Sequence, residues 1–129
     1  MSNIVNKWIE IAEYDFTTAK AMLKTGRYFY VAFMCQQALE KMLKALIVLK
    51  TNEYSPRVHK LEFLAVKAEI SEELNNEQKE LLNELSFFYL NSRYPDLNIG
   101  LGSLITKEKA KVLLKKTEEL LKWIKQKIK

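Results

Sequence analysis

The amino-acid sequence predicts an all-α protein, an antiparallel up-and-down bundle of four to five helices in a single domain that spans residues 1–129. Helix-breaking residues are scarce, with three glycines and two prolines in 129 residues. Apolar residues recur every three to four positions, which is the spacing of one face of a helix. A chain of this length can also bury a sizeable core without disulfides or a structural metal.

The first helix is expected from about residue 3 to 24, because its apolar residues follow helical spacing and Gly26 stands where a glycine commonly ends a helix. Asp15 interrupts this apolar stripe. Burying an unpaired carboxylate is costly, so we expect Asp15 to meet a cation inside the bundle. The candidate cations are Lys41, Lys44 and Arg93.

The second helix is expected from about residue 28 to 50. Its first half, YFYVAFMC, is apolar on all sides, which is typical of a helix that is enclosed by neighbours. Its second half is amphipathic, and Pro56 marks a break after it. We therefore expect this helix to be the central one.

Two further helices are expected at about residues 58–69 and 77–91, the latter capped by Asn75 or Asn76 and ended by Tyr94 and Pro95. The loop that follows, residues 96–105, is unusually aliphatic, so either the loop packs down or a partner covers it. Thr106 then caps a last helix with a long apolar seam.

The net charge of +5 is concentrated at the end of the chain. Residues 107–129 hold nine lysines and three glutamates, a charge of +6, whereas the remaining residues carry −1. A lysine-rich helix face is more often a solvated surface than a phosphate-binding stripe, so this charge alone does not define a function.

We expect a cytoplasmic protein that does not contact a membrane. The single cysteine, Cys35, cannot form an internal disulfide, which fits a reducing compartment. The N-terminus lacks the pattern of a secretion signal, and no apolar stretch reaches the roughly 18 residues of a membrane span.

No metal and no cofactor are expected. One histidine and one cysteine cannot form the usual nitrogen and sulfur ligand sets. The chain also lacks the GxxxxGK[ST], GxGxxG and GxSxG motifs of phosphate-binding loops, dinucleotide sites and hydrolase nucleophiles.

Three polar clusters remain, and each has an ordinary structural interpretation. In QQALEKMLKA, residues 36–45, the side chains of Gln37, Lys41 and Lys44 share one helix face with Glu40 beside them, a pattern typical of an exposed polar surface. His59 is the only histidine, and a lone histidine near a helix start is usually structural. Arg93 lies at a helix C-terminus, where the helix dipole favours a cation.

Taken together, these clusters resemble the HEPN family (higher eukaryotes and prokaryotes nucleotide-binding domain). The resemblance extends over nearly the whole chain. It includes the acidic first helix around AEYD at residues 12–15, the segment GRY at 26–28, QQALEKMLKA at 36–45, HKL at 59–61, the turn SRYPD at 92–96 and the closing amphipathic helix.

The resemblance implies a homodimeric helical bundle that is often encoded beside a minimal nucleotidyltransferase and acts in toxin-antitoxin pairs. Many relatives are metal-independent ribonucleases with an arginine followed by four to six residues and then a histidine. This chain departs from that motif, because no histidine follows Arg93 and His59 lies upstream. Ribonuclease activity of the usual kind is therefore not expected.

Our leading hypothesis is a dimeric module that binds a nucleotide or an RNA phosphate group, or docks a nucleotidyltransferase. The dimer would bury part of the aliphatic loop or an apolar helix flank. The alternatives are a ribonuclease that uses His59 and Arg93, and a purely structural helical interaction module. The expected ligand-binding residues are Lys41, Lys44, His59, Arg93 and Tyr94, and the expected orienting residues are Asp15, Gln37 and Glu40.

Overall fold

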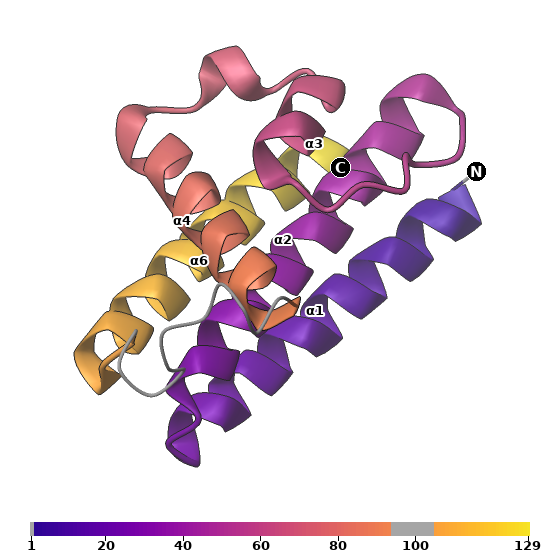
Figure 1. Ribbon diagram of the computed structural model, residues 1–129. Helices are drawn as coiled ribbons and strands as arrows, with labels where there is room; N and C mark the ends of the chain where they lie inside the picture. Colours follow the sequence, from indigo (N-terminus) through magenta and orange to yellow (C-terminus); the bar gives the residue numbers. More distant parts are fainter. Residues whose placement is uncertain (1, 94–104) are drawn as a thin grey trace.

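The computed structural model describes residues 2–93 and 105–129, apart from the side chains of Ser2 and Arg93. Within these residues the chain forms five α-helices and one short 3-10 helix, and no strand. The elements in order are α1 (Ser2–Lys24), α2 (Tyr28–Thr51), α3 (Leu61–Lys67), η1 (Ser71–Glu73), α4 (Asn76–Arg93) and α6 (Lys107–Ile128), as Figure 1 shows. The predicted all-α bundle is confirmed.

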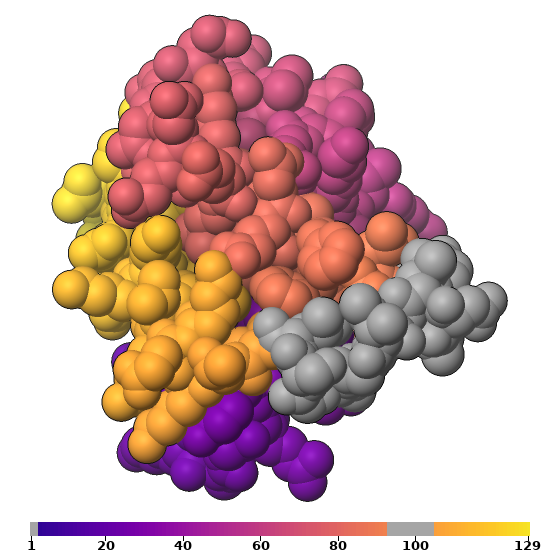
Figure 2. Space-filling model, turned by 60° about the vertical axis from the view of Figure 1, so that its left-hand side comes forward, coloured from indigo at the N-terminus to yellow at the C-terminus, as the bar shows by residue number. Residues whose placement is uncertain are grey.

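Helix α2 is the centre of the bundle, as its apolar first half predicts. It packs against α1, α3, α4 and α6. Helix α1 forms a hairpin with it, and the face of the molecule in Figure 2 shows α4 at the surface beside α6. Because every other α-helix in the described residues contacts α2, a polar side chain on α2 is enclosed unless it points between two neighbours.

The helix ends follow the capping chemistry of the sequence. Asn75 Oδ1 accepts a hydrogen bond from the Gln78 backbone N–H at 2.8 Å, and Gln78 Oε1 accepts one from the Asn75 N–H at 2.9 Å. Thr106 Oγ1 accepts from the Lys109 N–H at 3.1 Å. Gly26 has a φ of 77°, a left-handed conformation that glycine adopts without strain, and it separates α1 from α2.

The third helix is shorter than expected. Helix α3 begins at Leu61 rather than at residue 58, because residues 58–60 are not helical and Lys60 has an extended conformation with ψ of 115°. It ends at Lys67, and Glu69 then adopts a left-handed φ of 62°. The 3-10 helix that follows, η1, was not expected from the sequence.

The other boundaries lie within two residues of the expected ones. Helix α2 continues to Thr51, and α4 runs from Asn76 to Arg93. Most of the aliphatic loop, with Leu97, Ile99, Leu101 and Leu104, lies outside the described residues, as does Tyr94. Ile105, the last residue of that segment, is buried against the core.

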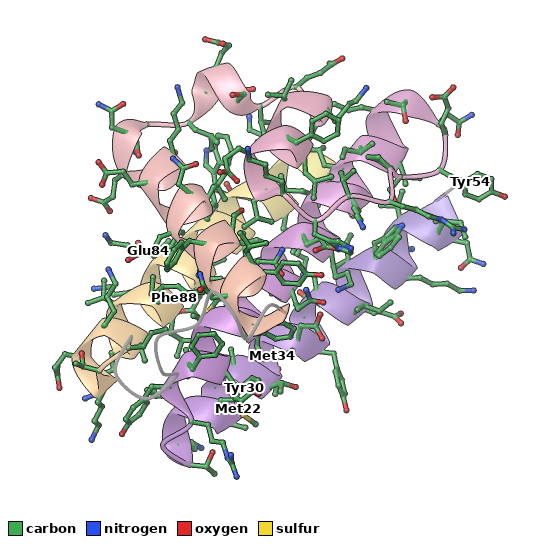
Figure 3. The ribbon with its side chains drawn as sticks, viewed as in Figure 1. Met22, Tyr30, Met34, Tyr54, Glu84 and Phe88 are labelled. Carbon is green, nitrogen blue, oxygen red and sulfur yellow. The ribbon has the colours of Figure 1, made fainter. Side chains whose placement is uncertain are left out.

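The core is apolar and continuous through the middle of the bundle. Figure 3 shows Phe88 inside the arrangement of helices, where it is buried, and Tyr54 at the far edge of the molecule, where it is 87% exposed. Among the described residues, none of the helices combines the length and apolar character needed to cross a lipid bilayer.

Candidate functional site

A cluster of four polar residues lies against the middle of α2, and we call it the α2 cluster: Gln36, Glu40, Lys44 and His59. Glu40 is its centre, and its side chain is only 3% exposed. Lys44 Nζ donates to Glu40 Oε2 at 3.0 Å, and Gln36 Nε2 donates to Glu40 Oε1 at 3.1 Å. His59 Nδ1 lies 3.1 Å from both carboxylate oxygens. The carboxylate is therefore enclosed by three donors.

Local backbone structure explains how His59 reaches α2. The residues between Pro56 and α3 are not helical, and Lys60, the last of them, has an extended conformation. Gln36 Nε2 also donates to the His59 backbone oxygen at 2.9 Å, which fixes this segment on α2. At its other end, the Leu61 N–H donates to Ser86 Oγ on α4 at 3.3 Å. The backbone segment that carries the imidazole is thus held by α2 and by α4.

The hydrogen bonds outweigh burial in setting the charge of Glu40. Burial alone would raise the pKa of its carboxyl group, but the hydrogen bonds from Lys44 and Gln36, the charge of Lys44 and the contact with His59 together lower the pKa below its ordinary value of 4.5. Glu40 is therefore ionised at neutral pH. Since an ionised carboxylate only accepts hydrogen bonds, His59 Nδ1 must be the donor, and Nε2 is directed away from Glu40.

The polar network continues from the α2 cluster to α1. Gln37 Nε2 donates to Gln36 Oε1 at 2.7 Å, and Lys41 Nζ donates to Gln37 Oε1 at 2.9 Å. Lys41 Nζ also lies 3.5 Å from Asp15 Oδ2. The expectation that Asp15 meets the polar face of the second helix is confirmed, with Lys41 as its partner.

Asp15 differs from Glu40 in the balance of these effects. Burial raises the pKa of the Asp15 carboxyl; Lys41 lowers it in part, through its charge and a hydrogen bond, while the charge of Glu40 raises it further. The net direction is upward from the ordinary value of 3.8. One cation at 3.5 Å thus compensates this carboxylate less completely than three donors compensate Glu40.

An open groove lies beside His59. It has a volume of about 400 Å³, and its lining comes from the segment before α3, from α3 and from α4. The His59 and Tyr89 rings are 5.2 Å apart, and the Tyr89 and Phe33 rings stack at 5.6 Å. The ammonium-bearing side chain of Lys60 and the half-exposed ring of Phe87 also line the groove. The Glu62 carboxylate also lines the groove and accepts a hydrogen bond from Ser86 Oγ at 2.7 Å. The groove therefore combines an imidazole, one lysine and one carboxylate with aromatic surface.

The structure changes the interpretation of several predicted residues. The sequence pattern of Glu40 and Lys44 is typical of an exposed face, and this interpretation is wrong, because both side chains are buried beneath the bundle surface. The indole of Trp8 covers Lys44, with Nζ 5.6 Å from the ring centroid. His59 and Lys41 reach the surface, with side chains 45% and 17% exposed.

Arg93 is the last residue of α4, and its side chain lies outside the described part of the structure, as does Tyr94. The fold nevertheless brings the two distant clusters of the sequence together. Tyr89, which contacts His59, precedes Arg93 by four residues, about one helical turn. His59 and the end of α4 therefore belong to one region of the surface.

Two participants were not selected from the sequence as site residues. Gln36 is fully buried and links Glu40 to the His59 backbone, and Tyr89 contacts the imidazole. Gln36 precedes Glu40 by four residues, so helical spacing places their side chains next to each other. This spacing is the signal in the sequence that identifies Gln36 as a partner of Glu40. Among the described residues, no three His, Cys, Asp or Glu side chains gather closely enough to hold a metal ion.

The fold and this site define an all-helical bundle with an ionised carboxylate and an imidazole packed on its central helix. The family model of the HEPN domain matches residues 5–128. The chain therefore belongs to the HEPN family, as its motifs predict. No curated protein matches it.

Two solved structures are similar to the chain over almost their full length. The crystal structure of TT1696 from Thermus thermophilus has a TM-score of 0.82 and 24% sequence identity, covering 97% of this chain and 98% of that one. The crystal structure of ST0689, an archaeal HEPN homologue, has a TM-score of 0.70 and 29% identity with the same coverage. The first likeness concerns the fold alone.

Proposed function

We propose that this HEPN protein binds a nucleotide or an RNA phosphate group in the groove beside His59. The observation that carries the proposal is the contact of His59 Nδ1 with both oxygens of the buried Glu40 carboxylate. The ionised carboxylate accepts from Nδ1–H, and this contact fixes the imidazole ring at the edge of the groove. The ring is held in place before any ligand arrives.

The surroundings of His59 suit a phosphate attached to a base or a ribose. Lys60 brings a cation to the groove, and Arg93 lies at the end of the adjacent helix, where a guanidinium can hold two phosphate oxygens. Tyr89 and the exposed ring of Phe87 provide aromatic surface on which a base can stack. Lys41 contributes positive charge from the neighbouring part of the network.

The proposal includes a homodimer and a nucleotidyltransferase partner in a toxin-antitoxin-like pair. Family membership supports both. Exposed apolar side chains on α1 and α2 also support a dimer, because Ile11, Tyr14 and Tyr30 are 44%, 75% and 41% exposed. Light scattering tests the dimer: a species of about 15.2 kDa at micromolar concentration contradicts it.

Ligand binding is tested with a short, fluorescein-labelled single-stranded RNA and fluorescence anisotropy over a range of salt concentrations. Binding is expected to weaken as salt rises, through counterion release. Arg93→Ala is expected to weaken binding about tenfold, since it removes a bidentate phosphate contact. The matched control is Lys79→Ala, which removes an exposed cation near the other end of α4. Equal effects of the two variants contradict the proposed site.

The Glu40 and His59 pair also favours a second candidate function, a metal-independent ribonuclease. A carboxylate that holds Nδ1–H leaves Nε2 able to accept the proton of a ribose 2′-hydroxyl as its oxygen attacks the adjacent phosphorus. The bond from phosphorus to the 5′-oxygen breaks, and the leaving oxygen takes a proton from water. His59→Asn separates the two functions, because an asparagine amide can still donate to Glu40 but cannot exchange a proton near neutral pH. Loss of RNA cleavage with retained folding supports the ribonuclease, whereas a wild-type protein that binds RNA without cleaving it excludes this candidate.

A further inference from the structure

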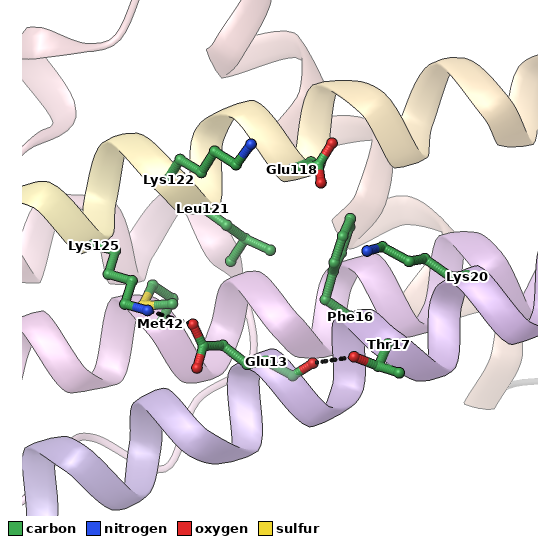
Figure 4. A pocket seen from close by; sticks show the side chains of 9 residues that line it. All are labelled: Glu13, Phe16, Thr17, Lys20, Met42, Glu118, Leu121, Lys122 and Lys125. Carbon is green, nitrogen blue, oxygen red and sulfur yellow. Dashed lines mark hydrogen bonds and ion pairs between the residues drawn. The ribbon is translucent and has the colours of Figure 1, made fainter.

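A second pocket lies between α1 and α6, on residues that the His59 groove does not share, and we call it the α1–α6 pocket. Its volume is about 320 Å³. Phe16 of α1, Met42 of α2 and Leu121 of α6 form an apolar floor, and all three are buried. Figure 4 shows Phe16 and Leu121 between the two helices, with charged side chains on both sides.

The charged groups around this floor are not equally compensated. Lys125 of α6 pairs with Glu13 of α1 and joins the two helices across the pocket. Lys20 and Lys122 form no ion pair within the described residues. Lys20 Nζ instead lies 5.1 Å from the Phe16 ring centroid, at the edge of the apolar floor. Glu118 is the one remaining carboxylate in the lining, so cations are in excess.

We infer that the α1–α6 pocket binds a small amphiphilic anion, meaning a carboxylate, sulfonate or phosphomonoester attached to an aromatic or aliphatic body. The apolar body would cover the floor and be removed from water. The anionic group would be attracted by Lys20 of α1 and Lys122 of α6, which together outnumber the Glu118 carboxylate that Figure 4 shows between them. The size of the pocket fits one small molecule, since ligand sites generally begin at about 300 Å³.

The probe for this inference is 8-anilinonaphthalene-1-sulfonate, an aromatic anion whose fluorescence rises in apolar surroundings. Its uncharged counterpart, N-phenyl-1-naphthylamine, reports the contribution of the anionic group. We expect the sulfonate probe to bind at least about tenfold more tightly than the neutral compound. Equal affinity for the two compounds overturns the inference, because the excess cations would then have no role.

Two variants locate the probe. The double variant Lys20→Glu with Lys122→Glu is expected to weaken sulfonate binding at least about tenfold, because two attractive charges become repulsive. Thr17→Trp is expected to abolish binding without any change in charge, because the exposed Thr17 lines the pocket and an indole would fill it. Retained binding in Thr17→Trp overturns the inference.

The matched control is Lys111→Glu with Lys115→Glu, an equal change of charge on the exposed face of the same helix. Lys115 precedes Lys122 by seven residues, about 10 Å along the helix, which exceeds the screening length at physiological salt. We expect less than a twofold change for this control. A loss equal to that of the Lys20 and Lys122 variant overturns the inference, since binding would then follow net charge. Circular dichroism checks that each variant is folded.

Discussion

The α2 cluster and the α1–α6 pocket contain the same kinds of charged side chain in opposite surroundings. In the α2 cluster, Glu40 and Lys44 are buried and every oxygen of the carboxylate has a donor. In the pocket, Glu13 and Lys125 are paired, but their side chains are 53% and 35% exposed. Water screens the second pair and is excluded from the first. The same substitution should therefore lower the free energy of unfolding by very different amounts in the two regions.

The largest expected effect belongs to Glu40→Ala. Removing the carboxylate leaves the Lys44 ammonium buried without its partner, a change that commonly costs about 3 kcal/mol. Glu13→Ala, the matched change in the exposed pair, is expected to cost less than about 0.5 kcal/mol. Urea denaturation of both variants measures the difference. Similar losses in the free energy of unfolding for the two variants would show that burial does not distinguish the two regions.

The rate at which Cys35 reacts with a thiol reagent gives an independent measure of the same difference. Cys35 is fully buried, and burial raises the pKa of its thiol to about 12, so it reacts only when the protein opens. A loss of about 3 kcal/mol increases the open population roughly a hundredfold. We expect Glu40→Ala to accelerate labelling by about that factor and Glu13→Ala by about twofold. Fast labelling of the wild-type protein at pH 8 would contradict the buried position of this thiol.

A smaller effect is expected from pH. The folded pKa of Glu40 is lowered, so its contribution to stability is complete above its ordinary value of about 4.5 and is lost as the pH falls through the folded pKa. Asp15 acts with the opposite sign, because its folded pKa is raised and its ionisation with rising pH destabilises the fold. We expect Glu40→Gln to lose part of the wild-type decline in melting temperature below pH 4.5, and Asp15→Asn to make that decline steeper. If the melting temperatures of the wild-type protein and both variants depended on pH in the same way, these assignments would be contradicted.

The smallest expected effect is that of salt on the pair formed by Glu13 and Lys125. Because the pair is partly exposed, its contribution of less than about 0.5 kcal/mol should vanish at about 1 M sodium chloride, where the screening length is about 3 Å. A double-mutant cycle at low and high salt measures this change. The cycle for Glu40 and Lys44 is expected to keep most of its coupling energy at high salt, and equal salt sensitivity of the two cycles would be the contradictory outcome.

The sequence predicts the helices well because local signals determine them. Apolar spacing locates α1, α2 and α6, and the side chains of Asn75 and Thr106 identify two helix starts. Asp15 was also correctly expected to need a partner, since its position on an apolar stripe is a local property.

The burial of Glu40 and Lys44 was not predictable in the same way. Helical spacing shows that the two residues share a face, but not what covers that face. His59, 19 residues further along the chain, contacts Glu40, and Trp8 of α1 covers Lys44. The same limit applies to the start of α3, because the non-helical residues before it are held by Gln36 and Ser86 from two other helices.

The hydrogen bond from Gln36 to the His59 backbone also determines where residues can be inserted into the chain without disturbing the site. It ties down the end of the α2 to α3 connection, while the stretch before it, around Tyr54, is exposed. Lengthening an exposed connection costs little, about 0.6 kcal/mol for each doubling of its length. A reporter peptide inserted between Glu53 and Tyr54 would therefore lengthen only the free part of the connection. The imidazole would keep its position, and the insert would provide a handle for attaching the protein to a surface or a fluorophore.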